Sequence, residues 1–185
     1  MKLLCSLILV FPLAGYAYGH TAEECTIYSL VISNLYVHAK SKLIVIDSKT
    51  RDPFGRSYID LTPRTGRRTV LEKITPLAWD DFKLQNTFPG TVEPTSLHLR
   101  VRTVSADPSL VAASVVDYWS AFYRKFPGSD GLISLSQVGF DRGSRQAVVY
   151  LWRSCGSLCA DEYVVLLSQT SGSWKIVDKY LVAVS

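Results

Sequence analysis

The chain has 185 residues, of which 48% are apolar and 19% are charged, and its formal net charge at pH 7 is +4. This size and apolar content suffice for one compact domain, and they exclude intrinsic disorder, a collagen-like repeat and a coiled coil. The excess of positive charge is too small to indicate a nucleic-acid partner by itself, so we predict none.

Residues 1–19 have the layout of a secretory signal peptide. Lys2 supplies a positive charge, residues 3–13 are almost entirely apolar, and small residues follow. The apolar stretch is interrupted by a proline and is shorter than the roughly 20 residues that a membrane span needs. We therefore predict cleavage after residue 19, with residue 17 as the alternative point, and a single exported domain over residues 20–185, periplasmic or secreted, with no transmembrane segment.

The first half of the mature chain predicts helices and strands on either side of an irregular segment. A capping box opens an amphipathic helix over residues 21–39. Residues 42–47 form a short β-branched run and predict a strand, whereas residues 48–68 have no periodicity and predict irregular chain. A Thr-Pro cap predicts a short helix over 76–85, and apolar alternation predicts a half-buried strand over 96–104.

The second half predicts one long helix followed by strands. The helix covers 108–126, and the strands cover 132–140, 146–153, 162–169 and 174–184, with short turns between them. The whole pattern predicts an α+β fold. Two longer helices and a short one pack on an antiparallel C-terminal β-meander of about four strands, and helix 108–126 covers the apolar face of that meander.

Cys155 and Cys159 are the most specific local feature of the sequence. In an exported protein, two cysteines that flank a glycine turn favour a disulfide that staples the loop. A redox-active pair and a metal site are the two alternatives, although neither the spacing nor further ligands support them. Cys25 is left over in the mature chain, and the sequence does not decide whether it pairs.

No pattern of catalytic residues stands out. His20, His38 and His98 are widely separated, and the sequence has no nucleophile elbow and no phosphate-binding glycine loop. We therefore predict no catalytic residue, no metal and no cofactor.

A basic segment in the irregular part of the chain, together with two arginines of the predicted 96–104 strand, is a candidate surface for an anionic ligand. The alternative is an ordinary solvated loop. The candidate anion-binding residues are Arg51, Arg56, Arg64, Arg67, Arg68, Arg100 and Arg102.

An aromatic stripe in the predicted 108–126 helix has two interpretations. It can line a ligand pocket under the sheet, or it can pack in the core, and core packing is favoured because a helix on a sheet needs such a stripe. The stripe consists of Trp119, Phe122, Tyr123 and Phe126.

Residues 118–177 resemble a family of exported bacterial proteins for which we know of no activity. The resemblance lies in an aromatic helix ending in FPGSDG, followed by SQVGF, QAVVY, CGSLC and GSWKI. It implies export, a bacterial origin and a single domain, and it carries no site residue to this chain. The order of helix and meander is also similar to that of NTF2-like and cystatin-like domains, which is an analogy of architecture alone.

These observations favour an exported, non-enzymatic domain that binds an unknown small molecule between helix and sheet, or an envelope partner. The alternative is a periplasmic or secreted hydrolase whose catalytic residues form no recognisable motif, and a thiol-redox role is a third hypothesis. The sequence does not indicate the ligand or the oligomeric state.

Overall fold

A computed structural model describes residues 21–38, 42–54, 70–106, 115–143 and 145–185. The predicted signal peptide, most of the basic segment and the start of the predicted 108–126 helix lie outside the described residues. Within them, no helix is long and apolar enough to cross a membrane.

The described residues form four α-helices, a 3-10 turn and one sheet of seven strands. The helical elements are α1 (Ala22–Leu35), α2 (Val70–Lys73), α3 (Pro76–Gln85), η1 (Pro94–Ser96) and α4 (Val115–Lys125). The strands are β1 (Leu43–Asp47), β2 (Arg102–Ala106), β3 (Ser129–Leu135), β4 (Gly139–Asp141), β5 (Gln146–Gly156), β6 (Cys159–Thr170) and β7 (Ser173–Val184).

The sheet has the order β2-β1-β3-β5-β6-β7, and β4 pairs with β5 beside β3. This arrangement is compatible with the predicted α+β class, and β3, β5, β6 and β7 pair antiparallel as the predicted C-terminal meander requires. The sheet has seven strands, however, where about four were expected. The two further strands of the main path, β1 and β2, join in parallel with β3. The first four residues of β1 are all buried, as is typical of a strand inside a sheet with both faces covered.

Two predicted strands have different bounds in the structure. The predicted 132–140 strand is divided into β3 and β4, because the hydroxyl of Ser136 accepts a hydrogen bond from the backbone of Tyr150 and interrupts the ladder. The predicted 96–104 strand begins only at Arg102, opposite the first residue of β1. Before that point the apolar alternation is real, since Leu97 is buried, but the backbone has no neighbouring strand to pair with.

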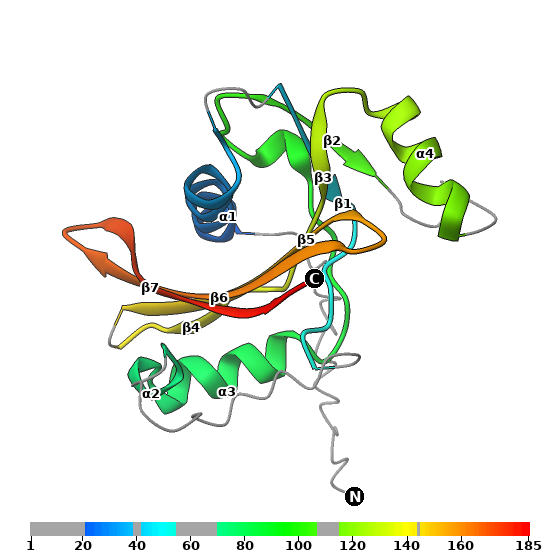
Figure 1. Ribbon diagram of the computed structural model, residues 1–185. Coiled ribbons are helices and arrows are strands. Elements are labelled where there is room, and N and C mark those ends of the chain that lie inside the picture. Colours follow the sequence, from blue (N-terminus) through cyan, green and yellow to red (C-terminus); the bar gives the residue numbers. More distant parts are fainter. Residues whose placement is uncertain (1–20, 39–41, 55–69, 107–114, 144) are drawn as a thin grey trace, which may run out of the picture.

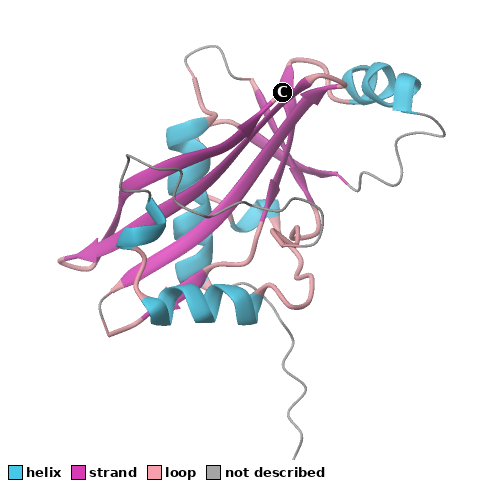
Figure 2. Ribbon diagram, turned by 60° about the horizontal axis from the view of Figure 1, so that its bottom comes forward, coloured by secondary structure: helices cyan, strands magenta, loops and turns pink. Residues whose placement is uncertain are grey.

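Both faces of the sheet are covered, by different helices (Figures 1 and 2). The apolar face of α1 packs on one face, where Val149 and Val165 lie in the same core cluster as Ile32. Helices α2 and α3 pack on the opposite face, against Val148 and Val164. The central strands β5 and β6 are apolar on both sides, so each face needs its own cover.

Helix α4 does not cover the meander, which corrects the sequence prediction. It packs at the other end of the sheet, where Phe122 and Phe126 contact a cluster that includes Leu43, Val45 and Leu132. The apolar side chains of β5 and β6 that α4 was expected to cover already pack against α1 on one face and against α3 on the other.

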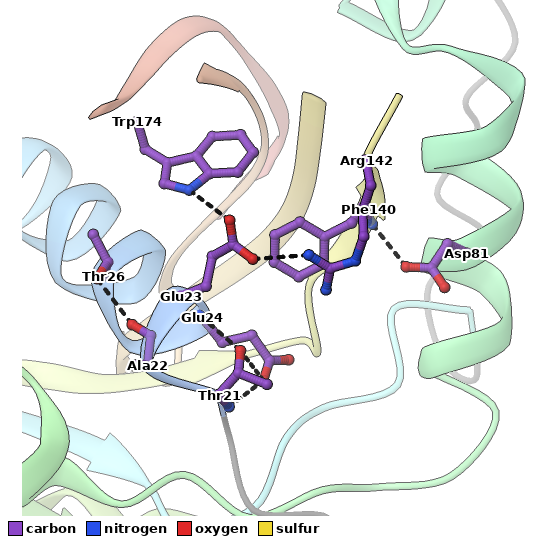
Figure 3. A network of polar contacts seen from close by, with 9 residues as sticks. All are labelled: Thr21, Ala22, Glu23, Glu24, Thr26, Asp81, Phe140, Arg142 and Trp174. Carbon is purple, nitrogen blue, oxygen red and sulfur yellow. Dashed lines mark hydrogen bonds and ion pairs between the residues drawn. The ribbon is translucent and has the colours of Figure 1, made fainter. Parts of the chain in front are cut away.

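The start of α1 is tied to β7 and to the end of β4 by a polar network (Figure 3). The carboxylate of Glu23 accepts hydrogen bonds from Nε1 of Trp174, at 3.2 Å, and from Nη1 of Arg142, at 3.0 Å. Asp81 of α3 accepts the backbone N–H of Phe140 at 2.7 Å. Because the members of this network satisfy one another, we interpret it as a structural clamp between the two helices and the sheet.

Candidate functional site

Four polar or amphipathic side chains lie in one line across four strands, on the face of the sheet that carries α3. Asp47 of β1 accepts a hydrogen bond from the hydroxyl of Ser134 of β3 at 3.3 Å. Ser134 pairs in register with Trp152 of β5, and Trp152 pairs with Glu162 of β6. Paired residues of a sheet point to the same face, so the four side chains form a polar row.

The polar row lies between two apolar clusters on the same face. On one side, Val45 and Leu132 belong to the cluster under α4. On the other side, Tyr150 and Val164 belong to the cluster under α2 and α3. In ligand pockets a few polar groups amid apolar ones fix a ligand's orientation, so the polar row is a candidate site.

Arg51 is brought to the row by the segment that leaves β1. The backbone N–H of Arg51 donates to the carbonyl of Leu135 at 2.7 Å, which fixes this segment at the end of β3. Its guanidinium stacks over the ring of Trp152. Three residues further on, the ring of Phe54 meets the ring of Phe82 of α3 edge to face, with centroids 5.7 Å apart. The segment thus crosses the sheet face and places a cation at the centre of the polar row.

Tyr150 and Glu162 form a hydrogen-bonded pair beside the row. The phenol of Tyr150 donates to Oε2 of Glu162 at 2.9 Å. Burial, above all, and then this hydrogen bond and the carboxylate's charge, hold the pKa of Tyr150 well above its usual range, while Arg51 opposes them. The phenol therefore stays neutral and acts as a fixed donor that orients the carboxylate.

The indole N–H of Trp152 is buried and has no hydrogen-bond partner among the residues that the structure describes. A buried donor without an acceptor costs about 1–3 kcal/mol, and native proteins rarely leave one unsatisfied. Trp152 lies under Arg51, and it pairs in register with Ser134 on one side and with Glu162 on the other. Its N–H is the group of the row that needs an acceptor from outside the described residues.

The two carboxylates of the row are far apart. Asp47 and Glu162 are separated by three strand spacings, about 14 Å between their Cα atoms at roughly 4.8 Å per spacing. In glycoside hydrolases the two catalytic carboxyl groups lie about 5–9.5 Å apart. The two carboxylates of the row thus start from more widely separated backbone positions, with Ser134 and Trp152 between them.

The candidate arginines of the sequence do not gather into one surface. Arg51 stacks on Trp152 at the polar row. Arg100 and Arg102 are exposed and lie before and at the start of β2, at the opposite edge of the sheet from β7. The remaining four candidates fall outside the described residues: Arg56, Arg64, Arg67 and Arg68.

The aromatic stripe of α4 contributes to the core. Phe122 is fully buried and Phe126 nearly so. Trp119 and Tyr123 are half-buried against the same cluster, and the phenol of Tyr123 donates to the carbonyl of Cys155 at 2.8 Å. These contacts match the core interpretation of the stripe, although the second interpretation, a ligand pocket, is not tested by them.

Cys155 and Cys159 are joined by a disulfide, with their Cα atoms 5.0 Å apart. The bond spans the end of the β5–β6 hairpin, and the strands are longer here than the sequence predicted, because the tight turn leaves only Ser157 and Leu158 outside them. Cys25 is a free thiol, buried in α1. Burial is the main cause that raises its pKa, so it is a poor nucleophile.

A second polar cluster lies on the opposite face of the sheet. Arg153 and Asp161, which also face each other in β5 and β6, form an ion pair of 2.6 Å. The phenol of Tyr36, just after α1, donates to Asp161 at 3.0 Å. Burial, then the charge of Asp161, keeps the pKa of Tyr36 well above its usual range. This cluster joins the end of α1 to the sheet, and Nε of Arg153 is buried in it without a hydrogen-bond partner among the described residues.

The other features of the described residues include two shallow hollows but no metal site. No three His, Cys, Asp or Glu residues lie together as a metal site requires, in the part of the chain that the structure describes. His98 is exposed on the chain leading to β2, and its backbone N–H donates to Ser29. Two shallow hollows of about 250 and 360 Å³ lie along α3, beside Phe88 and Trp79 respectively.

The sequence analysis missed Trp152, Glu162, Asp47 and Ser134, although a signal was present for two of them. Trp152 and Glu162 lie at equal distances from Ser157, so a hairpin with its turn at that residue pairs them. The predicted strands 146–153 and 162–169 left residues 154–161 between them, and no pairing of individual residues was predicted. The contribution of Asp47 and Ser134 depends on the parallel pairing of β1 with β3, for which the sequence has no local signal.

No family model, no curated protein and no solved structure matches this chain. The resemblance to exported bacterial proteins therefore stays an expectation from the sequence.

Proposed function

We propose that the protein is an exported, non-enzymatic binding domain that holds a small molecule on the polar row. The row offers a cation, a neutral phenol donor, two carboxylates and an aromatic face within one line of side chains. These are groups that recognise a polar ligand at several points. The disulfide at the hairpin end supports export, because such bonds persist in oxidising compartments.

The observation that carries this proposal is the buried N–H of Trp152, which finds no acceptor in the described part of the chain. A structural tryptophan at this position is replaceable by phenylalanine at little cost beyond packing. A binding tryptophan uses its N–H, since a ligand acceptor that reaches it removes the penalty of leaving the donor unpaired. The two roles therefore differ in what a change from Trp152 to Phe does.

The first test is native mass spectrometry of the protein purified from its exported fraction. We expect a retained small molecule in the wild-type protein, and at least tenfold less of it in Trp152→Phe and Arg51→Gln. Arg102→Gln is the matched control, because it removes an exposed arginine far from the row, and it retains the ligand. Equal retention by all four proteins places the ligand elsewhere and contradicts the proposal.

The mature N-terminus is tested on the same sample. Export with cleavage after residue 19 predicts a chain that begins at His20 and carries one intact disulfide. An unprocessed chain in the cytosol contradicts export.

The hydrolase hypothesis predicts a different outcome from the same variants. A hydrolase loses turnover when Asp47 or Glu162 is replaced by its amide, while a binding domain shows no turnover in the wild-type protein. An activity screen against ester, amide, phosphoester and glycoside substrates separates the two.

A further inference from the structure

We propose that the hollow at the end of α3 binds a small, neutral aromatic molecule that carries a hydroxyl or N–H group, as phenols and indoles do. The hollow measures about 250 Å³. No residue of the polar row is among the described residues that line it, so this second site does not rest on the proposed function. The described residues that line the hollow are Leu84, Gln85, Thr87, Phe88, Pro89 and Gln137.

The amide of Gln137 is the polar group on which the inference depends. Gln137 is only 6% exposed, and it is one of the residues that line the hollow. Its Nε2 donates to the backbone carbonyls of Gln85 and Phe88. Only the NH₂ end of an amide can donate to two carbonyls, so the orientation of this amide is fixed. Its Oε1 accepts no hydrogen bond from a described residue, and it is therefore the end that is left for a ligand.

Gln85 adds a second acceptor of the same kind. Its Nε2 donates to Oδ1 of Asp81 at 3.1 Å, and its Oε1 has no donor in the described part of the chain. The hydroxyl of Thr87 is also engaged, because it donates to the carbonyl of Lys83 at 3.3 Å. The hollow lies at the C-terminal end of α3, where the helix dipole is negative. The hollow thus offers acceptors, and a matching ligand brings the donor.

Buried hydrogen bonds hold the frame of the hollow in place. Asn86, just after α3, accepts the backbone N–H of Gln137 at 2.8 Å, and its own amide donates to the carbonyl of Gln137 at 3.1 Å. Further along the chain, the backbone N–H of Gly90 donates to the hydroxyl of Thr50 at 2.6 Å. The segment 87–89, which forms one side of the hollow, is therefore held at both ends. A site that is already in place costs less free energy to occupy.

The walls and the size of the hollow favour a single aromatic ring. Leu84 is 69% exposed and Phe88 is 75% exposed, so a ring that packs on them removes apolar surface from water. A cavity of about 150 Å³ is large enough for benzene, and this hollow exceeds that volume. Among the described residues, no charged side chain lines it, so an ion would lose hydration there without a counter-charge. These features favour a neutral ring.

An NMR titration of the ¹⁵N-labelled protein with phenol, indole and toluene tests the inference. Toluene carries a methyl group where phenol carries its hydroxyl, so the two molecules have nearly the same shape. A purely apolar hollow prefers toluene, because phenol gives up its hydrogen bonds to water. We expect phenol to bind about fivefold or more tightly than toluene, because it satisfies an acceptor that toluene leaves unpaired. We also expect the side-chain amide resonances of Gln137 to shift with phenol, and those of Gln169 in β6 to stay in place.

Exposed residues supply variants that keep the fold. Phe88→Ala and Leu84→Ala each remove apolar wall and are expected to weaken phenol binding about threefold or more. Leu77→Ala is the matched control, because Leu77 is 67% exposed on the same helix and is not among the residues that line the hollow. We expect Leu77→Ala and Trp152→Phe to leave the affinity for phenol unchanged. Circular dichroism of each variant establishes that it is folded.

Each contrary outcome overturns the inference in a distinguishable way. If toluene binds as tightly as phenol, the acceptors of the hollow do not select a donor. If benzylamine, which is cationic, binds as tightly as phenol, the ligand class is not neutral. If the affinity for phenol falls in Trp152→Phe and not in Phe88→Ala, phenol binds at the polar row and the hollow is not the site. A spectrum that neither phenol nor indole changes overturns the inference outright and leaves the proposed function standing.

Discussion

Trp152 and Arg153 are neighbours in β5 whose side chains lie on opposite faces of the sheet, each facing a carboxylate of β6. Trp152 pairs with Glu162 and Arg153 pairs with Asp161. The first pair belongs to the polar row under Arg51, and the second closes an ion pair under the end of α1. One hairpin thus supplies a candidate ligand site to one face and a structural link to the other.

The structural role of the Arg153–Asp161 pair predicts a loss of stability in Asp161→Asn. The side chains are 26% and 14% exposed, so the pair is intermediate between a buried and a surface ion pair. We expect the free energy of unfolding to fall by about 2 kcal/mol, because the guanidinium keeps its charge without its partner. Asp80→Asn breaks an exposed pair with Lys83 and is expected to cost less than about 0.5 kcal/mol. Equal losses in urea denaturation contradict this account.

The packing of α3 on the sheet predicts a contrast between two of its own residues. Phe82 is fully buried, whereas Leu84 is 69% exposed. Phe82→Ala is expected to lower the free energy of unfolding by about 3–5 kcal/mol. Leu84→Ala is expected to change the free energy of unfolding by less than about 0.5 kcal/mol, because the exposed side chain of Leu84 has few buried contacts to lose. Thermal or urea denaturation of the two variants measures the difference, and a large loss in Leu84→Ala indicates that something covers the outer side of α3.

Local patterns in the sequence were sufficient for several elements. The Thr-Pro cap places α3 at Pro76–Gln85, as predicted, and the capping box at Thr21 starts α1. The β-branched run at 42–47 contains β1. Each of these signals acts within one segment, where hydrogen bonds and side-chain spacing are decided by neighbours in the chain.

What the sequence could not supply depends on contacts between distant segments. The position of α4 is decided by competition with α1 and α3 for the faces of β5 and β6. The polar row needs the parallel pairing of β1 with β3, which brings Asp47 to Ser134 from 87 residues away. The position of Arg51 depends on where the irregular segment crosses the sheet, and no periodicity describes that segment.

The disulfide predicts a moderate contribution to stability. Closing a loop of about five residues stabilises the fold by about 2 kcal/mol in the loop-entropy account. The double change of Cys155 and Cys159 to Ser is therefore expected to lower the free energy of unfolding by about that amount while leaving the protein folded. Peptide mapping without reductant shows the Cys155–Cys159 link in the wild-type protein, and Cys25 is alkylated only after denaturation. Rapid alkylation of Cys25 in the folded protein contradicts its burial.

Three buried tyrosines predict a loss of stability at high pH. Burial raises the pKa of Tyr28, Tyr36 and Tyr150 above the usual value of about 10. Above pH 10 the unfolded chain ionises these phenols readily, whereas the folded protein does not. The contribution of these tyrosines to the free energy of unfolding is therefore complete below pH 10 and is lost as the pH rises above it. We expect the midpoint of urea denaturation to decrease as the pH is raised above 10. The decrease is expected to be less steep in Tyr150→Phe than in the wild-type protein. Absorbance at 295 nm that shows all tyrosines ionising near pH 10 in the folded protein contradicts the prediction.

A crystal structure of the exported protein, purified without exchanging its bound molecules, tests the central claim most directly. The account predicts density on the polar row with an acceptor atom about 2.9 Å from Nε1 of Trp152. A structure in which the chain's own atoms accept that N–H, with the row covered and no ligand density, contradicts it.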